Sequence, residues 1–346
     1  MPDGSIRVGV VGLGQWGPNF LRNFETAPGA ALTAIADSDI VRLDKVRAVY
    51  PRPRASLDAR AVIEDPEVDA VVIATPTHTH YELARMALEN GKHVLVEKPI
   101  APSSRQALEL GDLADRCGRT LLVGHVFLYN QAIRYLKDVI RSSEFGATLY
   151  LHSRRTNLGP VRSDVHAGWD LASHDISIFL FLLDEFPIEV TASAKSFIRE
   201  GLPDVVFATL TFPSGVLAHL HTSWLDPQKV RDVTVVGTNE MVVFDDMKLA
   251  EPVRIYHRGF RRVEDGASQV VDSFGAFRVE LVQGDVIIPS VSTGEPLRNE
   301  CDAFLRAIRE RRPPVADGRL GWAVVRVLEA IDRSIEQRNA VVPIDW

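Results

Sequence analysis

The chain has 346 residues, of which 46% are hydrophobic and 25% charged, as expected for a globular protein of two domains. Its formal net charge of −7 argues against nucleic acid or an acidic membrane surface as partners. The two cysteines, Cys117 and Cys301, lie far apart in the sequence and form neither a disulfide framework nor a metal-ligand motif. We expect the basic pairs Arg261-Arg262 and Arg311-Arg312 to lie on the solvated surface.

Nothing in the sequence predicts membrane insertion or export. The segment before the first predicted strand is short and polar, which is not typical of a signal peptide. The longest apolar run, residues 176–183, is too short to cross a bilayer. We therefore expect a soluble protein, and the cysteine usage fits the reducing cytoplasm.

Residues 6–125 alternate short apolar runs with helical stretches. Each run is nearly continuous in β-branched and aliphatic residues, as strands covered on both faces are. We predict strands at 7–11, 31–36, 70–74, 93–96 and 120–123, and helices at 18–26, 81–90 and 104–117. Alternating strands and helices predict an α/β fold with a doubly wound parallel sheet.

The rhythm changes after about residue 145. A predicted helix at 169–183 precedes strands at 205–212, 216–222, 233–236, 241–244 and 253–256, and helices at 295–311 and 319–339 close the chain. Strands at hairpin spacing beside a few helices predict an α+β domain with a large open, mainly antiparallel sheet. Because an open sheet needs a partner for its exposed face or edge, we expect a homodimer or homotetramer through this sheet.

A glycine motif follows the first predicted strand. Gly12, Gly14 and Gly17 form G-x-G-x-x-G between a strand and a helix, the context in which such a turn binds the pyrophosphate of a dinucleotide. Asp37 ends the second strand 20 residues after Gly17, where a carboxylate accepts hydrogen bonds from the adenosine ribose. We therefore predict a Rossmann domain at residues 1–125 and a domain for substrate binding and oligomerisation at residues 126–346. The Asp37 carboxylate would repel the 2′-phosphate of NADP and therefore favours NAD, although the positive charge of Arg42 could offset this repulsion.

Further motifs resemble the Gfo/Idh/MocA family, named after glucose–fructose oxidoreductase, inositol dehydrogenase and a rhizopine-catabolism protein. They are Ala74-Thr75-Pro76-Thr77-His78-Thr79-His80, Glu97-Lys98-Pro99, Gly124-His125, and Trp169-Asp170-Leu171-Ala172-Ser173-His174-Asp175. The resemblance covers essentially the whole chain. It implies a nicotinamide enzyme acting on a sugar, cyclitol or related polyol, with Lys98, Asp170 and His174 in catalysis.

The positions of these three residues agree with that role. Lys98 follows the carboxyl end of a parallel strand, where ligands bind in open α/β sheets, and the Lys98–Pro99 bond could be cis. Asp170 and His174 share one helix face, so the carboxylate could orient an imidazole that takes the proton of a secondary alcohol. Alternatively, Lys98 is a surface lysine, Asp170 a helix cap and His174 a buried hydrogen-bonding group. Asp175 could be a structural or a substrate-binding acid.

The segment 154–162 is basic and rich in turns, which suits a substrate cleft. Arginines bind phosphate or carboxylate through two hydrogen bonds, which suits a sugar nucleotide or a sugar acid as substrate, although the segment could also be a solvated loop. Within the family that the chain resembles, some relatives with such a segment oxidise the C3 hydroxyl of UDP-N-acetylhexosamines. The expected substrate-binding residues are Lys98, His125, Arg155, Asn157, Arg162, Trp169, Asp170 and His174. The expected cofactor-binding residues are Gly12, Leu13, Gly14, Gln15, Trp16, Gly17, Asp37, Thr75, Pro76, Thr77, His80, Glu97 and Lys98.

The resulting hypothesis is an NAD(P)-dependent dehydrogenase or ketoreductase acting on a secondary alcohol of a sugar nucleotide. Its alternatives are a cyclitol dehydrogenase, a non-catalytic NAD-binding regulator, a reductase of imines or enones, and an oxidoreductase that retains its cofactor. No spacing of His, Cys, Asp or Glu predicts a metal site, and no Gly-x-Ser-x-Gly motif predicts a serine hydrolase.

Overall fold

The computed structural model describes residues 4–162, 165–262, 279–292 and 294–346. The chain divides into two compact units. The first consists of Met1–Asn130 and Gly294–Glu329, and the second of Gln131–Thr293 and Ala330–Trp346. The domain boundary expected after residue 125 stays a prediction. The observed division differs from it mainly because Gly294–Glu329 packs with the first unit.

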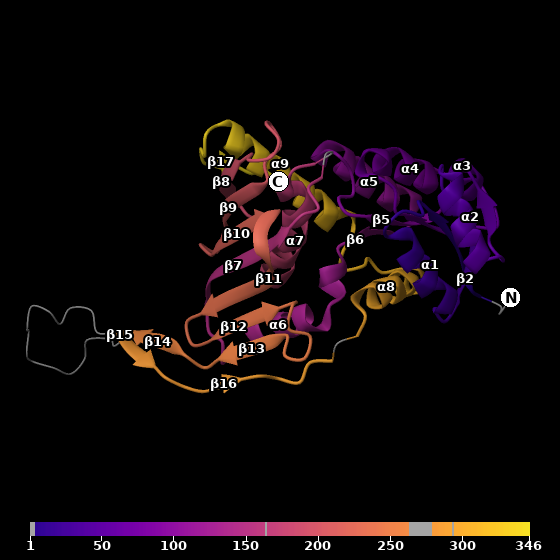
Figure 1. The fold of residues 1–346 in the computed structure, drawn as a ribbon. Coiled ribbons are helices and arrows are strands. Elements are labelled where there is room, and N and C mark those ends of the chain that lie inside the picture. Colours follow the sequence, from indigo (N-terminus) through magenta and orange to yellow (C-terminus); the bar gives the residue numbers. More distant parts are fainter. Residues whose placement is uncertain (1–3, 163–164, 263–278, 293) are drawn as a thin grey trace, which may run out of the picture. The chain divides into compact units, whose positions relative to one another are not determined.

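The first unit contains a six-stranded parallel sheet (Figure 1). Its strands, in the order β3-β2-β1-β4-β5-β6, are β1 (Ile6–Val11), β2 (Ala30–Ala36), β3 (Arg54–Ser56), β4 (Ala70–Ile73), β5 (His93–Glu97) and β6 (Leu121–Gly124). The order reverses between β1 and β4, which is where open α/β sheets bind ligands. The predicted doubly wound sheet is confirmed. The short edge strand β3 lacks a continuous apolar run and was not predicted.

Helices cover both faces of this sheet (Figure 1). They are α1 (Gly17–Thr26), α2 (Ile40–Val49), α3 (Arg60–Ile63), α4 (Thr77–Glu89), α5 (Ser104–Cys117), α8 (Pro296–Glu310) and the first part of α9 (Gly318–Glu336). Helices α4 and α5 pack together, as do α1 and α8. Phe24 of α1 meets Phe304 of α8 edge to face, with ring centroids 6.5 Å apart. Gly118 ends α5 with a left-handed backbone.

The second unit contains a nine-stranded sheet (Figure 1). In the order β16-β13-β12-β11-β7-β10-β9-β8-β17, its strands are β7 (Thr148–Leu158), β8 (Glu189–Lys195), β9 (Val205–Thr211), β10 (Leu217–Ser223), β11 (Leu225–Gly237), β12 (Met241–Asp245), β13 (Val253–Tyr256), β16 (Val286–Ile287) and β17 (Val342–Pro343). Among the described strand pairs of this nine-stranded sheet, only β7–β10 is parallel. The predicted mainly antiparallel open sheet is confirmed.

Helices α6 (Gln131–Ile140) and α7 (Ser173–Leu183) pack against each other and against this sheet. A π-helical turn, Gly168–Ala172, leads directly into α7. The predicted helix at 169–183 is therefore present, but with a wider first turn. Strands β14 (Gly259–Arg262) and β15 (Val279–Val282) form a separate two-stranded sheet. The side chains of the basic pair Arg261-Arg262 lie outside the described part of the structure.

Candidate active site

The glycine turn, residues 12–17, joins β1 to α1, and the chain's own packing requires its first and third glycines. Gly12 has φ of +92°, and a Cβ there would lie 2.6 Å from the carbonyl oxygen of Ala74. A Cβ on Gly17 would overlap the carbonyl oxygen of Gly12. Both glycines therefore allow backbone segments to approach more closely than a side chain would permit.

Gly14 is different, because little of the chain lies beside it. A Cβ there would meet just one group, the guanidinium of Arg42, at an ordinary 3.6 Å. Trp16 caps α1 without a side-chain hydrogen bond, and the first turn carries no acidic residue. The space beside Gly14 and the N–H groups at the start of α1 are thus left for an anionic ligand, and this cradle fits the pyrophosphate of a dinucleotide.

Asp37 follows β2 and is tied to the glycine turn. Its buried carboxylate accepts the Leu13 N–H at 2.6 Å and the Asp39 N–H at 2.8 Å. Two carboxylate oxygens offer about four acceptor positions, so Asp37 can still accept from ribose hydroxyls. Arg42, 3.3 Å from Asp39, is the nearby basic group expected from the sequence.

The turn after β4 is held by a short chain of hydrogen bonds. Thr79 Oγ1 donates to the Pro76 carbonyl at 2.8 Å, so Thr75 Oγ1 is the donor in its 2.6 Å contact with Thr79 Oγ1. The buried ring of His80 lies between the Thr75 and Pro99 carbonyls, at 2.8 and 2.7 Å. Burial lowers the pKa of His80 although both carbonyls favour the cation. His80 therefore ties the β4 turn to the β5 turn.

The turn after β5 carries Lys98. Its bond to Pro99 is cis, as the sequence suggested, and its amide N–H donates to the Glu97 carboxylate at 3.1 Å. Burial raises the pKa of Glu97 to about 7, against the opposing effect of the Lys98 charge. A Cβ on Gly124 would lie 3.2 Å from the same carboxylate, so β6 passes directly against Glu97.

Two further buried groups belong to this region of the first unit. His125 follows β6, and burial, reinforced by the Lys98 charge, lowers its pKa to about 3. Glu300 on α8 is fully buried, and burial together with Glu97 raises its pKa well above its usual value. Within the described part of the chain, neither side chain has a hydrogen-bond partner. Lys98 is thus flanked by groups that prefer to be uncharged, and no pattern in the sequence had pointed to Glu300.

The Rossmann unit brings these groups to one edge of its sheet. Because all six strands are parallel, the residues that follow them lie at the same edge. From the β2 end to the β6 end this edge presents Asp37, the glycine turn, Thr75, Lys98 and His125.

In the second unit, Asp170 lies in the π-helical turn, and His174 follows in the first turn of α7. Asp170 accepts from Arg162 Nη1 at 3.4 Å and from the indole N–H of buried Trp224 at 3.3 Å. π-helical turns are rare and are often found at functional sites. Arg162 and Asp170 are thus brought together as ligand-facing candidates.

Asp332 on α9 organises the segment before Asp170. Its carboxylate lies 2.8 Å from His166 Nε2 and accepts the Trp169 indole N–H at 2.7 Å. The Gly168 N–H donates to His166 Nδ1 at 3.1 Å. The sequence singled out Trp169 but missed Asp332, which lies 163 residues further along the chain.

The Arg155 side chain forms an ion pair within the second unit. Its guanidinium and the Asp175 carboxylate are both buried and form a two-pronged ion pair at 2.9–3.1 Å. Burial raises the pKa of Asp175, while Arg155 lowers it. The pair fixes β7 to α7, and the expectation that Arg155 binds substrate stays a prediction. Nearby, Asn157 donates to the Gly159 carbonyl and shapes the end of β7.

In the part of the chain that the structure describes, no three His, Cys, Asp or Glu side chains are grouped as a metal site. The described helices include none with the length and apolar character needed to span a membrane.

Comparisons with known proteins agree with this architecture. The profile described as "Oxidoreductase family, NAD-binding Rossmann fold" matches residues 6–125, and the "GFO/IDH/MocA C-terminal domain" matches residues 133–243. UDP-N-acetylglucosamine 3-dehydrogenase from Acidithiobacillus ferrooxidans is 30% identical over 332 residues, covering 96% of this chain and 97% of that protein. An inositol 2-dehydrogenase from Saccharopolyspora erythraea is 33% identical over 62% of this chain and 65% of its own length.

Solved structures give the same result. The structure of the Acidithiobacillus ferrooxidans dehydrogenase has a TM-score of 0.80 at 27% identity, covering 96% of this chain and 98% of that one. An oxidoreductase from Magnetospirillum magnetotacticum has a TM-score of 0.79 at 32% identity, covering 94% and 99%. The profiles and the full-length relative show that this chain belongs to the Gfo/Idh/MocA family of NAD(P)-dependent oxidoreductases.

Proposed function

We propose that this oxidoreductase is a sugar-nucleotide dehydrogenase that oxidises the C3 hydroxyl of a UDP-N-acetylhexosamine, or reduces the corresponding ketone. The observation that carries the proposal is the similarity to UDP-N-acetylglucosamine 3-dehydrogenase along nearly the full length of both chains. Arg162 supports it, since an exposed guanidinium near the substrate segment suits the pyrophosphate of a sugar nucleotide.

The cofactor proposed to serve this reaction is NAD. When bound, it supplies the nicotinamide ring that exchanges hydride with the substrate carbon. The glycine turn, with Leu13, Gln15 and Trp16, and the N–H groups of α1 would hold its pyrophosphate, and Asp37 would accept from its ribose. The turns after β4 and β5 would border the nicotinamide through Thr75, Pro76, Thr77, Glu97 and Lys98. His80 contributes by positioning both turns.

The chain's own residues supply the proton transfer. We assign His174 as the base that takes the hydroxyl proton, because an imidazole can accept and return a proton near neutral pH. Asp170, held by Arg162 and Trp224, positions His174. The Lys98 ammonium stabilises negative charge that develops on the substrate oxygen. His125, Asn157 and Trp169 complete the substrate contacts.

A substrate panel tests this function. The purified protein is incubated with UDP-N-acetylglucosamine, UDP-N-acetylgalactosamine or myo-inositol, each with NAD and with NADP, and reduced cofactor is followed by absorbance. We expect reduction of NAD with a UDP-N-acetylhexosamine and little with myo-inositol. Faster turnover of myo-inositol would favour the cyclitol alternative, which the inositol dehydrogenase relative supports.

Two further results, one from the panel and one from the purified protein itself, would contradict the proposal. If no sugar, cyclitol or sugar nucleotide is turned over although NAD binds, the chain is a non-catalytic NAD-binding regulator. If cofactor co-purifies and resists dialysis, the protein retains its cofactor instead of exchanging it, and single-turnover spectra of the bound cofactor would show this.

We further propose that the chain forms a homodimer or homotetramer in the cytoplasm. On one face of the second sheet, Tyr150, Phe207 and Leu217 are each 41–46% exposed, and they line a shallow cavity of 490 Å³ with His152, His219 and His221. The ring of Phe207 stacks on His221 at 4.3 Å. An exposed aromatic face of this kind suits a second copy of the chain. Both cysteines are free thiols, as suits a reducing compartment.

A further inference from the structure

The first unit contains a large cavity that the proposed reaction does not use. Its volume is about 1160 Å³, and it lies where β5 and β6 begin, lined also by α5, by the end of α8 and by the start of α9. The Lys98 turn lies at the other end of β5. His93 and Glu97 lie four positions apart, or about 13 Å along β5. The cavity is therefore distinct from the candidate active site.

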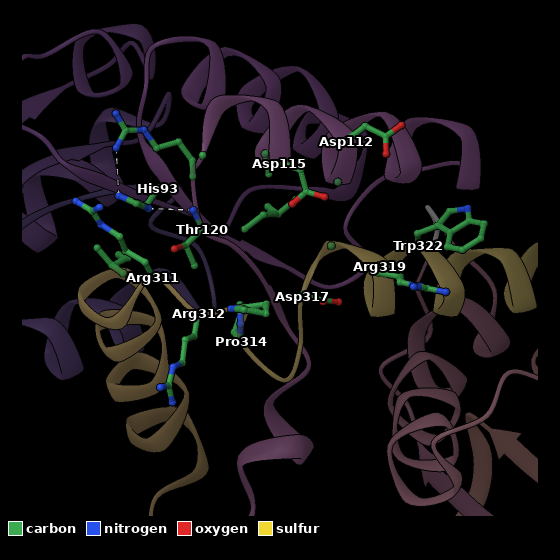
Figure 2. A pocket seen from close by; sticks show the side chains of 18 of the residues that line it. His93, Asp112, Asp115, Thr120, Arg311, Arg312, Pro314, Asp317, Arg319 and Trp322 are labelled. Atoms are coloured by element: carbon green, nitrogen blue, oxygen red, sulfur yellow. Dashed lines mark hydrogen bonds between the residues drawn. The ribbon is translucent and has the colours of Figure 1, made fainter.

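Basic side chains gather around one side of this cavity. Arg119, Arg311 and Arg312 belong to its lining, and in the described part of the chain none of them forms an ion pair with a carboxylate. Figure 2 shows Arg311 and Arg312 on the same side as His93, with Arg319 and Trp322 on the other. The lining also contains Arg319 and three carboxylates, Asp112, Asp115 and Asp317, so the excess of positive charge belongs to the side that carries Arg119, Arg311 and Arg312.

His93 and Arg119 present two hydrogen-bond donors to one point. The Thr120 N–H donates to His93 Nδ1 at 3.0 Å (Figure 2). Burial, together with the Arg119 charge, lowers the pKa of His93 to about 4, so the ring is neutral near pH 7. A neutral ring that accepts at Nδ1 carries its proton on Nε2. Nε2 lies 3.5 Å from Arg119 Nη1, which is also a donor, so an anionic oxygen beside them would accept from both.

Arg311 is held in an unusual conformation. It follows α8 with φ of +53°, a left-handed backbone at a position where helices commonly place glycine. An arginine there costs about 1 kcal/mol relative to glycine. Residues in such conformations are enriched at functional sites, but Asp184, Arg338 and Asn339 share this backbone, so it is the position of Arg311 in the cavity lining that points to a site.

We propose that this cavity binds a phosphorylated small molecule, whose phosphoryl group is received by Arg119, Arg311 and the His93 Nε2–H. Nitrogen donors from three side chains of the lining could together bind the three oxygens of a phosphoryl group. The remainder of the ligand lies toward Asp115 and Trp322, which line the cavity further on. A carboxylate and an indole face suit a hydroxyl-rich body such as a sugar. Arg311-Arg312, expected from sequence to be plain solvated surface, is thus assigned to a ligand site.

Calorimetric titration of the full-length protein with glucose 6-phosphate, inorganic phosphate and glucose tests the proposal. We expect glucose 6-phosphate to bind, inorganic phosphate to bind more weakly, and glucose not to bind. Arg311→Gly should weaken glucose 6-phosphate binding about tenfold or more, the usual effect of losing a charged hydrogen bond. Because glycine relieves the left-handed backbone, this variant should unfold at the same or a higher temperature, so weaker binding cannot be ascribed to misfolding.

Arg338→Gly is the matched control. Arg338 also has a left-handed backbone, with φ of +56°, and it does not line the cavity. Its variant should bind as the unmodified protein does, whereas Arg119→Ala should repeat the loss. The proposal is overturned if glucose 6-phosphate does not bind, or if Arg311→Gly and Arg119→Ala bind normally. It is also overturned if Lys98→Ala abolishes binding, because the sugar phosphate would then occupy the candidate active site.

Discussion

Gly12 and Gly14 stand two residues apart in one motif, yet a side chain would have different consequences at each. Gly12→Ala would strain a φ of +92° and push Cβ against the Ala74 carbonyl, so we expect a loss of about 2 kcal/mol or more in unfolding free energy. Gly14→Ala meets no such obstacle. It should keep its stability but bind NAD about tenfold more weakly, because the methyl group occupies space meant for the pyrophosphate.

Thermal unfolding and calorimetric titration with NAD separate the two effects. If Gly14→Ala binds NAD as tightly as the unmodified protein, the cradle beside Gly14 does not hold the pyrophosphate.

Glu97 gives the stability of the fold a pH dependence. Its pKa rises from an ordinary value of 4.5 in the unfolded chain to about 7 in the fold, so the folded state holds the proton more tightly. The stabilisation of the fold by protonated Glu97 is complete below pH 4.5 and is lost as the pH rises through 7. Relative to Glu97→Gln, the unmodified protein should therefore lose on the order of 3 kcal/mol of unfolding free energy between pH 5 and pH 8.

Urea unfolding at several pH values measures this difference. Exposed Glu336 at the end of α9 is the control position, and Glu336→Gln should follow the unmodified protein at every pH. A constant gap between Glu97→Gln and the unmodified protein would show that Glu97 ionises normally.

The site residues that could be predicted from the sequence are those that belong to short motifs. Glycine spacing, the Glu97-Lys98-Pro99 motif and the carboxylate after β2 are encoded in short segments. Asp332, Trp224 and Glu300 belong to no short pattern, since each reaches its neighbours through the tertiary fold. The sequence likewise does not show that Arg155 has a buried partner, Asp175, which lies 20 residues away on a neighbouring helix.

At the scale of elements, the buried Arg155–Asp175 pair joins β7 to α7. Removing one partner leaves an unpaired buried charge, so Arg155→Ala should cost about 3–5 kcal/mol of unfolding free energy. The paired replacement Arg155→Met with Asp175→Leu should recover most of that loss. By contrast, Arg85→Ala breaks an exposed pair with Glu89 on α4 and should cost at most about 1 kcal/mol.

Denaturant unfolding of the three variants checks this. If Arg155→Ala costs no more than Arg85→Ala, the pair does not hold the two elements together.

Elements were predictable where their periodicity is strong. The buried strands of the parallel sheet and helices α5 and α8 agree closely with the sequence patterns, because each satisfies its apolar and capping requirements locally. Short edge strands such as β3 and β17 depend on a neighbouring strand for their definition. The return of Gly294–Glu329 to the first unit also has no local signal, because α8 binds α1 through contacts more than 270 residues apart in the chain.

At the scale of the whole molecule, the proposed oligomer rests on the exposed face of the second sheet. Leu217→Glu places a charge on that face and should dissociate the assembly. Leu249→Glu is the control, since Leu249 is 75% exposed but lies in the turn that follows β12. Light scattering during size-exclusion chromatography should report a lower mass for Leu217→Glu alone. A monomeric unmodified protein, or a Leu217→Glu variant of unchanged mass, would contradict the proposed interface.

The most direct test of the proposed chemistry is the turnover of UDP-N-acetylhexosamine by Lys98→Ala and His174→Ala, measured beside their affinity for NAD. Losing a positioned proton-transfer or charge-stabilising group should lower turnover by about 10²-fold or more, while both variants still bind NAD. Exposed Lys195 serves as the control, and Lys195→Ala should turn over normally. Near-normal turnover in both the Lys98→Ala and His174→Ala variants would contradict the catalytic assignment.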